Sequence, residues 1–344
     1  MMASAPVEAS VGVPEARTTP EERGVPRDGV RLLVSRGSHD EDFRFGELPD
    51  LLRSGDLLVV NESATVPASL PASGRVGPFR VSLSTQYSER MWLAEPRWSM
   101  DRPGPVGLAV GEEFRLGQLP ARVVAPYPGI SRLVFLKVQG DVRSEMARVG
   151  SPIRYGYLAH AYPLSEYQTV FARIAGSAEM PSAGRPFTPG LVERLEQRGI
   201  DFAPILLHTG VSSLETVDIE PGMSPVYPEP FEVPEPTVRA VANARARGGR
   251  VIAVGTTVLR ALASAVDACG LRPARGFTSV FLRPGRSVPA LDGLITGFHA
   301  DRTTHLELLR SIVPGERLDR SYRIARERRY LWHEFGDSHL LLTS

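Results

Sequence analysis

The sequence predicts an α/β main domain with a mostly parallel sheet, into which a small antiparallel β-barrel domain is inserted. Short runs that are apolar on both faces alternate with amphipathic helical segments, which is typical of parallel strands covered by helices. Between two stretches of this kind, residues 67–153 change to short alternating segments broken by Gly and Pro, as in small antiparallel barrels or sandwiches. The length of 344 residues with 42% hydrophobic content is enough to bury a real core.

Composition places the domain boundaries. Residues 1–25 contain Pro, Glu, Ala and Thr without periodicity, which predicts a disordered or loosely draped leader. We expect the main domain at residues 26–66 and 154–344, and the barrel domain at residues 67–153.

The first elements follow from apolar spacing. Leu48, Leu51 and Leu52 predict a short helix, and the strand 57–61 follows it with apolar residues on both faces. Period-two segments then predict barrel strands at residues 79–83, 91–94, 113–116, 121–124 and 132–136.

Capping residues define the elements after the barrel. Thr188 and Pro189 form a good N-cap and N1 pair, and Gly199 closes that helix. The elements expected next are a strand at 204–208, a helix through 238–244 that ends at Gly248-Gly249, a strand at 250–255 and a helix at 259–268.

Cysteine use and hydropathy limit the class of protein. The one cysteine, Cys269, excludes an internal disulfide and a cysteine-based metal cage, and we expect it to be a small buried hydrophobe. All apolar runs are shorter than the roughly 18 to 20 residues of a membrane helix, and the N-terminus lacks an apolar signal region. We therefore expect a cytoplasmic protein.

Nearly all the basic residues are arginines, with Lys137 the one lysine, and the net charge is +1. Five arginines lie near the C-terminus on a segment with helical spacing. They form either a phosphate-facing patch or an ordinary solvated helix face. These arginines are Arg320, Arg323, Arg326, Arg328 and Arg329.

Polar residues follow three of the predicted strands. Because ligands bind beyond the carboxyl ends of strands in open α/β sheets, these residues are candidates for a site. They are the segments Asn61-Glu62-Ser63 and His208-Thr209-Gly210, and the turn Gly255-Thr256-Thr257 with Arg260 one helical turn later. Free helix N–H groups, hydroxyls and a guanidinium can hold a carboxylate or phosphate.

Each of these residues also has a structural alternative. Asn61 can close an Asx-turn, His208 can be a satisfied core histidine, and Thr256 or Thr257 can cap a helix. A fourth stretch, residues 165–188, is rich in Gly, Ser and Ala, and carries Glu179 and Arg185 as its charged members. It is either a plain loop or one whose backbone amides approach a ligand closely.

Six co-linear motifs resemble signature segments of the S-adenosylmethionine:tRNA ribosyltransferase-isomerase family, over roughly residues 28 to 343. The opening strand 55–61 also matches. The motifs are Tyr167-Gln168-Thr169-Val170-Phe171-Ala172, Gly176-Ser177 with Ala183-Gly184, Leu207-His208-x-Gly210, Val254-Gly255-Thr256-Thr257-x-Leu259-Arg260, Leu294-Ile295-Thr296-x-Phe298-His299, and Phe335-Gly336-Asp337.

The resemblance implies that the ribosyl part of S-adenosylmethionine is transferred to 7-aminomethyl-7-deazaguanine in tRNA and rearranged to epoxyqueuosine. Adenine and methionine are released. S-Adenosylmethionine is then the co-substrate and tRNA the partner. No metal is needed, since the sulfonium activates the adjacent C5′ toward a positioned base.

The resemblance also implies site residues. His208 and His299 are the candidates for proton transfer, and Glu229 and Asp337 for a cationic or ribose contact. Arg260 and the turn 255–257 are expected to hold an anionic group of the ligand. The expected binding residues are Asn61, Tyr167, Gln168, Thr169, Gly176, Ser177, Ala183, Gly184, Gly210, Gly255, Thr256, Thr257, Arg260, Thr296 and Phe298.

Several positions depart from the family pattern. Two family arginines are replaced by Ala64 and Ser69, and a family histidine by Pro186. In the segment 224–229 only the carboxylate of Glu229 is kept, and Glu334 stands where the family has Ser. These losses leave two alternatives: a diverged paralogue that uses a small-molecule acceptor or acts on the cofactor itself, and a non-catalytic binding protein with the same fold.

Overall fold

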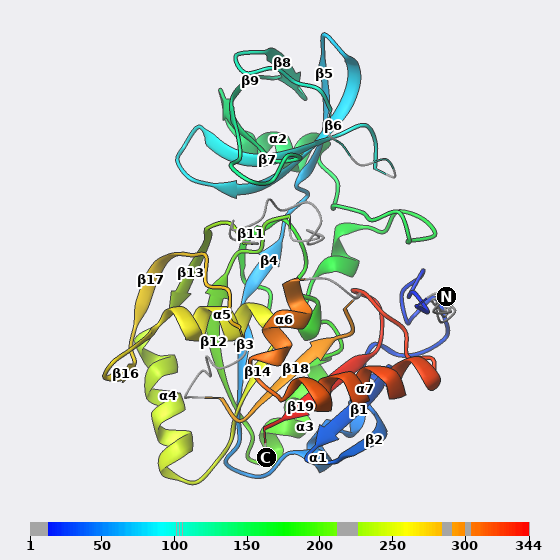
Figure 1. The fold of residues 1–344 in the computed structure, drawn as a ribbon, viewed down its shortest axis with the longest axis vertical. Helices are drawn as coiled ribbons and strands as arrows, with labels where there is room; N and C mark the ends of the chain where they lie inside the picture. The colour runs from blue at the N-terminus through cyan, green and yellow to red at the C-terminus, as the bar shows by residue number, and fades with distance from the viewer. Residues whose placement is uncertain are drawn as a thin grey trace, which may run out of the picture.

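The structure is a computed structural model that describes residues 13–100, 102, 104, 106–211, 226–283, 291–299 and 304–343. An α/β domain built on a nine-stranded sheet carries a closed six-stranded barrel at one end (Figure 1). The predicted fold class is therefore confirmed, while the domain boundaries at residues 66/67 and 153/154 stay predictions.

The main sheet has the strand order β17-β13-β12-β3-β14-β18-β19-β1-β2. The sheet is mixed. β12, β3, β14 and β18 run parallel in the centre, as expected, and β1 is parallel to β19. β19 is antiparallel to β18, and β17, β13 and β2 add antiparallel edges. A two-residue connection such as that between β1 and β2 permits only an antiparallel neighbour. The strands are β1 (Arg31–Arg36), β2 (His39–Arg44), β3 (Leu57–Asn61), β12 (Asp201–Leu207), β13 (Glu229–Val233), β14 (Val251–Val254), β17 (Ala274–Thr278), β18 (Gly293–Gly297) and β19 (Ser338–Leu342).

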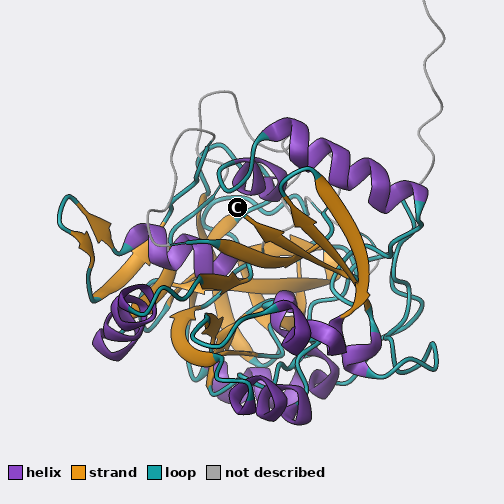
Figure 2. Ribbon diagram, turned by 90° about the horizontal axis from the view of Figure 1, so that it is seen from below, coloured by secondary structure: helices purple, strands orange, loops and turns teal. Residues whose placement is uncertain are grey.

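Helices lie on both sides of this sheet (Figure 2). Leu57 and Val59 of β3 belong to one apolar cluster with residues of α4, α5, α6 and α7, while Leu58 and Val60 belong to a second cluster with residues of α1 and α3. Burial on both faces explains why the central strand is apolar throughout. The helices are α1 (Leu48–Leu51), α3 (Pro189–Gln197), α4 (Glu235–Ala246), α5 (Thr256–Ser264), α6 (Thr304–Arg310) and α7 (Gly315–Glu327).

The barrel closes in the order β10-β7-β6-β5-β8-β9, with all pairings antiparallel. Its interior is a separate apolar cluster that includes Leu70, Val81 and Leu136. The parallel pair β4 (Ser63–Thr65) and β11 (Ile174–Ser177) lies between sheet and barrel (Figure 1). The barrel elements are β5 (Ser69–Gly74), β6 (Gly77–Gln86), β7 (Met91–Arg97), β8 (Glu113–Leu116), β9 (Leu119–Pro126), β10 (Val134–Val138) and α2 (Val142–Val149).

Two expectations about the region after α5 are wrong. The helix expected at 259–268 ends at Ser264, and a short hairpin of β15 (Val266–Asp267) and β16 (Gly270–Leu271) follows. Cys269 is at the tip of this hairpin and is exposed rather than buried.

The leader expected to be disordered is ordered over residues 13–25. Ala16 is 1% exposed, its N–H donates to the carbonyl of Trp332, and the Trp332 N–H donates to the carbonyl of Pro14. These bonds join distant parts of the chain, and composition does not reveal them. Residues 1–12 lie outside the described part.

Four of the five C-terminal arginines are engaged within the molecule, Arg323 in an exposed pair with Glu327. Arg320 is paired with Asp40 of β2, Arg328 with Asp42 of the same strand, and the Arg326 guanidinium lies over the Trp332 ring. This supports the helix-face reading rather than a phosphate patch. In the described part of the chain, no helix is both long enough and apolar enough to cross a membrane.

Candidate active site

A cavity of about 420 Å³ opens at the carboxyl edge of the parallel strands. This is the edge from which β4 rises toward the barrel (Figure 1). Thr209 follows β12, Gly255 follows β14 and Phe298 follows β18, and all three line the cavity. Further walls come from segments 152–157, 178–183 and 333–334, and from residues of segment 226–229 and of α6. Its position is the one expected for a ligand site in an α/β sheet.

Ten of the nineteen expected site residues line this cavity and nine do not; their roles stay predictions. Those in the lining are Tyr167, Ala183, Glu229, Gly255, Thr256, Thr257, Arg260, Thr296, Phe298 and His299. Those outside it are Asn61, Gln168, Thr169, Gly176, Ser177, Gly184, His208, Gly210 and Asp337.

The turn before α5 presents polar groups to the cavity. Gly255 has φ of 98°, a left-handed value that favours glycine, and its N–H donates to the carbonyl of Ile295 over 2.8 Å. Helix α5 therefore begins at Thr256 and points its first N–H groups toward the cavity. The Thr257 hydroxyl is buried and has no hydrogen-bond partner among the described residues. An anionic ligand group could bind to these donors.

The charge of Arg260 is already compensated. Its Nη1 donates to Oε2 of Glu229, and its Nε donates to the carbonyl of Val280 over 3.1 Å. The second carboxylate oxygen of Glu229 accepts the N–H of Gly210 over 2.6 Å. Arg260 is thus held as a partner of Glu229, which leaves anion binding mainly to the helix terminus and the threonines.

Two stacked histidines form another wall. The rings of His299 and His305 are 4.5 Å apart and 6° from parallel, and Nε2 of His299 is 3.0 Å from the Thr296 hydroxyl. Burial, together with the neighbouring histidines, holds the pKa of His299 well below its usual value. Burial and then the charge of Arg260 lower the pKa of His305 to about 4. Both rings are neutral at pH 7. The sequence interpretation missed His305, although it follows His299 by only six positions.

His208 lies beside the cavity and not in it. Its Nδ1 is 2.7 Å from the Ser63 hydroxyl, which is itself 2.5 Å from the hydroxyl of Ser177. Burial, followed by the charge of Arg143, lowers its pKa to about 4. The ring covers Gly176, where a Cβ atom would be 2.5 Å from it. These contacts favour the alternative of a satisfied core histidine over proton transfer to a ligand.

Asp337 and Asn61 hold backbone segments together. The carboxylate of Asp337 accepts the N–H groups of Arg31 and Leu331 over 2.9 and 2.8 Å. Burial raises its pKa, although both hydrogen bonds lower it. The amide of Asn61 bonds both backbone groups of Leu207, and its oxygen also accepts the N–H two residues on, as in an Asx-turn. A ligand contact by either side chain has no support here.

Gln168, Thr169 and Gly184 support the fold around the cavity. The side chain of Gln168 pairs with both backbone groups of Thr65 over 3.1 and 2.8 Å. Gly184 packs against the methyl group of Thr169, where an added Cβ would be 3.3 Å away. These residues position the cavity wall.

An aromatic wall in the cavity was not predicted. The rings of Tyr155 and Tyr157 are 6.0 Å apart and 10° from parallel, and that of His333 is 4.3 Å from Tyr157 at 18°. His333 has φ of 74°, which is rare for a non-glycine residue and marks a constrained backbone. The recurrence of tyrosine at 155, 157 and 162 was the available signal.

Glu334 lines the cavity next to His333. Burial raises the pKa of its carboxyl to about 7. The sequence interpretation noted Glu334 only as a departure from the family pattern. Elsewhere in the lining, the carboxylate of Glu179 accepts a hydrogen bond from the Tyr155 hydroxyl.

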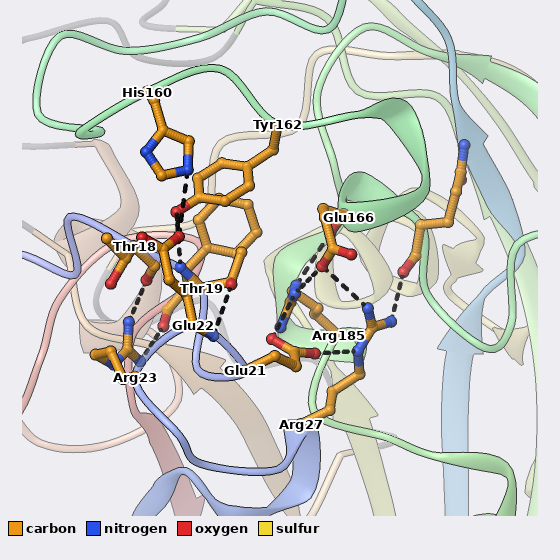
Figure 3. A network of polar contacts seen from close by, with 12 residues as sticks. Thr18, Thr19, Glu21, Glu22, Arg23, Arg27, His160, Tyr162, Glu166 and Arg185 are labelled. Carbon is orange, nitrogen blue, oxygen red and sulfur yellow. Dashed lines mark hydrogen bonds and ion pairs between the residues drawn. The ribbon is translucent and has the colours of Figure 1, made fainter.

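The loop that carries Glu334 is fixed by residues 13–27, which we term the N-terminal strap (Figure 3). Arg185 is 2% exposed and bonds Glu166 and Glu21 over 2.7 and 3.1 Å, with its guanidinium 4.7 Å from the Phe335 ring centre. Arg23 of the strap donates to the carbonyl of Phe335 over 2.8 Å. Arg185 therefore anchors the strap and does not face a ligand.

The described residues contain no group of three or more His, Cys, Asp or Glu side chains arranged to hold a metal ion. The polar and aromatic groups in the cavity lining are hydroxyls, imidazoles, carboxyl groups, the Arg260 guanidinium and tyrosine rings.

A chain with this sheet, inserted barrel and cavity belongs to the class of queuosine biosynthesis proteins. The model of that family matches residues 13–341. Within this class, the chain belongs to the S-adenosylmethionine:tRNA ribosyltransferase-isomerase family. It is 36% identical to the enzyme of that name from Thermus thermophilus over 337 residues, which cover 92% of this chain and 94% of the relative. The Moorella thermoacetica enzyme is 37% identical over 329 residues, with coverage of 92% and 94%.

A solved structure has the same fold. The crystal structure of S-adenosylmethionine tRNA ribosyltransferase from Thermotoga maritima matches with a TM-score of 0.51 and 28% identity, and covers 94% of this chain and 98% of that chain.

Proposed function

We propose that this protein transfers the ribosyl moiety of S-adenosylmethionine to 7-aminomethyl-7-deazaguanine in tRNA and isomerises it, which gives epoxyqueuosine and releases adenine and methionine. The proposal rests on one observation: in a chain of this family, the cavity at the carboxyl edge of the sheet gathers residues from separate family motifs. The shared name of the relatives favours tRNA as the acceptor over a small molecule. With tRNA as its substrate, we expect the protein in the cytoplasm.

The cavity suits a sulfonium nucleoside. The first turn of α5, with Thr256 and Thr257, is where we place the carboxylate of the methionine part. His299 is neutral because burial lowers its pKa, so it adds no positive charge that would repel the sulfonium. A neutral imidazole held by Thr296 is also able to accept a proton.

Purified protein incubated with S-adenosylmethionine and tRNA that carries the deazaguanine precursor tests the proposal. Mass spectrometry of the digested tRNA should detect epoxyqueuosine, with adenine and methionine released in equal amounts. His299→Asn should lower kcat by roughly 10²–10⁴-fold, whereas His39→Asn, on the exposed side of β2, should leave it unchanged. Consumption of S-adenosylmethionine at the same rate without tRNA would contradict the assignment of the acceptor.

A further inference from the structure

The aromatic wall of Tyr155, Tyr157 and His333 is a surface on which a flat ring can stack. Tyr157 lies between Tyr155 and His333 with its ring nearly parallel to both, and all three residues line the cavity while being only partly buried. Because the three rings line the cavity and are only partly buried, a flat ligand can pack against the part of this stack that the cavity exposes. Burial also lowers the pKa of His333, which keeps this ring neutral and able to stack. A purine ring fits such a surface.

A carboxyl group stands at the edge of this wall. Glu334 follows His333 directly, and the left-handed backbone at His333 turns the chain between the buried rings of Trp332 and Phe335. The Glu334 carboxyl has no side-chain partner among the described residues, although it lines the cavity. Its own backbone N–H bonds to it, and no side chain of the described residues does, so this half-buried carboxyl is available to a ligand.

The other charged or titratable groups in the described lining are already committed or neutral. Glu229 and Arg260 form an ion pair, and Glu179 accepts the hydroxyl of Tyr155. His299, His305 and His333 are neutral because burial lowers their pKa values. Glu334 is therefore the acidic group of the lining that changes its protonation near neutral pH, since burial raises its pKa to about 7.

We propose that Tyr157 and His333 hold the adenine ring of S-adenosylmethionine and that the Glu334 carboxyl protonates this ring as it departs. This rests on the proposed function. When the bond between ribose C1′ and adenine N9 breaks, its electron pair goes to the adenine. The proton moves from Glu334 to a ring nitrogen, so adenine leaves as the neutral base and Glu334 becomes a carboxylate. A neutral leaving group departs more easily than an anion.

Ligand binding tests the subsite without turnover. By calorimetry, Tyr157→Ala should weaken S-adenosylhomocysteine by about 5- to 150-fold, which is the loss expected when base–aromatic stacking is removed. S-Ribosylhomocysteine, which lacks adenine, should bind this variant and the wild type alike. Phe277→Ala, an exposed aromatic residue of β17 outside the lining, is the matched control and should change neither ligand. Equal losses for both ligands, or no loss for either, would overturn the subsite.

Turnover tests the proton donor. Glu334→Gln should lower kcat for adenine release by roughly 10²–10⁴-fold, with the KM for S-adenosylmethionine nearly unchanged. A general acid must be protonated to act, so wild-type kcat should fall above about pH 7, and this descending limb should be absent in Glu334→Gln and kept in Glu334→Asp. Glu327→Gln, on the exposed face of α7, is the control. An unchanged pH profile in Glu334→Gln would overturn the assignment.

The failure of the proposed function can be told apart from the failure of the subsite. If the wild type releases no adenine with tRNA, the proposed function fails, whereas the binding measurements still decide the subsite.

Discussion

Arg260 and Glu229 form a buried ion pair in the cavity wall, with 7% and 4% of each residue exposed. Removing one partner leaves the other charge uncompensated, which typically costs about 3–5 kcal/mol. We expect Arg260→Ala to lower the free energy of unfolding by about this amount in urea titrations. The double variant Arg260→Ala with Glu229→Gln removes both charges and should recover part of the loss. If the double variant is less stable than the single one, the pair is not the source of the effect.

His208 should make stability depend on pH. Its pKa is about 4 in the folded protein because of burial and then the charge of Arg143, against 6.5 for an exposed histidine. Since the depressed pKa belongs to the folded state, the contribution of the neutral ring is complete above about pH 6.5 and is lost as the pH falls toward 4. Unfolding titrations across this window should show a smaller decline for His208→Gln than for the wild type. His39→Asn should decline like the wild type, and a parallel decline for His208→Gln would contradict the expectation.

At the scale of elements, the N-terminal strap holds the loop 331–336 in place through hydrogen bonds. Arg185 pairs with Glu21 of the strap and with Glu166. In Arg185→Ala both carboxylates lose this buried partner. We expect this variant to release the strap, so that the amides of Ala16 and Trp332 exchange hydrogen faster and proteases cleave within residues 13–27. Arg239→Ala, which removes an exposed pair on α4, is the control. Unchanged protection in Arg185→Ala would show that the strap is held by other contacts.

Elements whose signal is local could be predicted from the sequence. The helix that begins after Thr188 has its cap, its proline and its apolar stripe within a dozen residues, and the structure contains it as α3. The strap carries no such signal, because its hydrogen bonds go to Trp332 and Phe335 more than 300 positions away. Sequence patterns describe neighbours along the chain, and the strap is stabilised by neighbours in space.

The candidate site shows the same limit. The turn at Gly255 and the segment at Phe298 lie at strand ends, so the position of the cavity follows from the sheet. The aromatic wall comes from the loop after the barrel and from the C-terminal loop, and only the fold brings Tyr157 and His333 together. For His208 the sequence pattern is misleading. Its place at a strand end predicts a ligand contact, but its ring bonds to Ser63, which in turn bonds to Ser177.

At the scale of the whole molecule, the barrel and the main domain meet next to the cavity. The hydroxyl of Ser84, in barrel strand β6, accepts the N–H of Val211 over 3.0 Å and donates to the Tyr227 hydroxyl over 2.8 Å. Tyr227 in turn donates to the carbonyl of Val211 over 2.5 Å. Gly210 lies within this junction, and its N–H also orients Glu229. A substitution at Gly210 should therefore change both the contact between the domains and the position of Glu229 in the cavity wall.

Gly210→Ala tests this coupling. An added Cβ would be 2.2 Å from the Ser84 hydroxyl and 2.3 Å from that of Tyr227, so these side chains, or the segments that carry them, must shift. We expect a loss of about 1–3 kcal/mol in the free energy of unfolding and weaker binding of S-adenosylmethionine by calorimetry. Adding Ser84→Ala and Tyr227→Phe removes both clashing hydroxyls and should restore part of the stability. Gly190→Ala on α3 has open space around its Cβ and should be neutral or slightly stabilising. Both effects are expected because a shift at Gly210 also moves Glu229 in the cavity wall. If Gly210→Ala destabilises the protein while its affinity for S-adenosylmethionine equals that of the wild type, the domain contact and the cavity are independent.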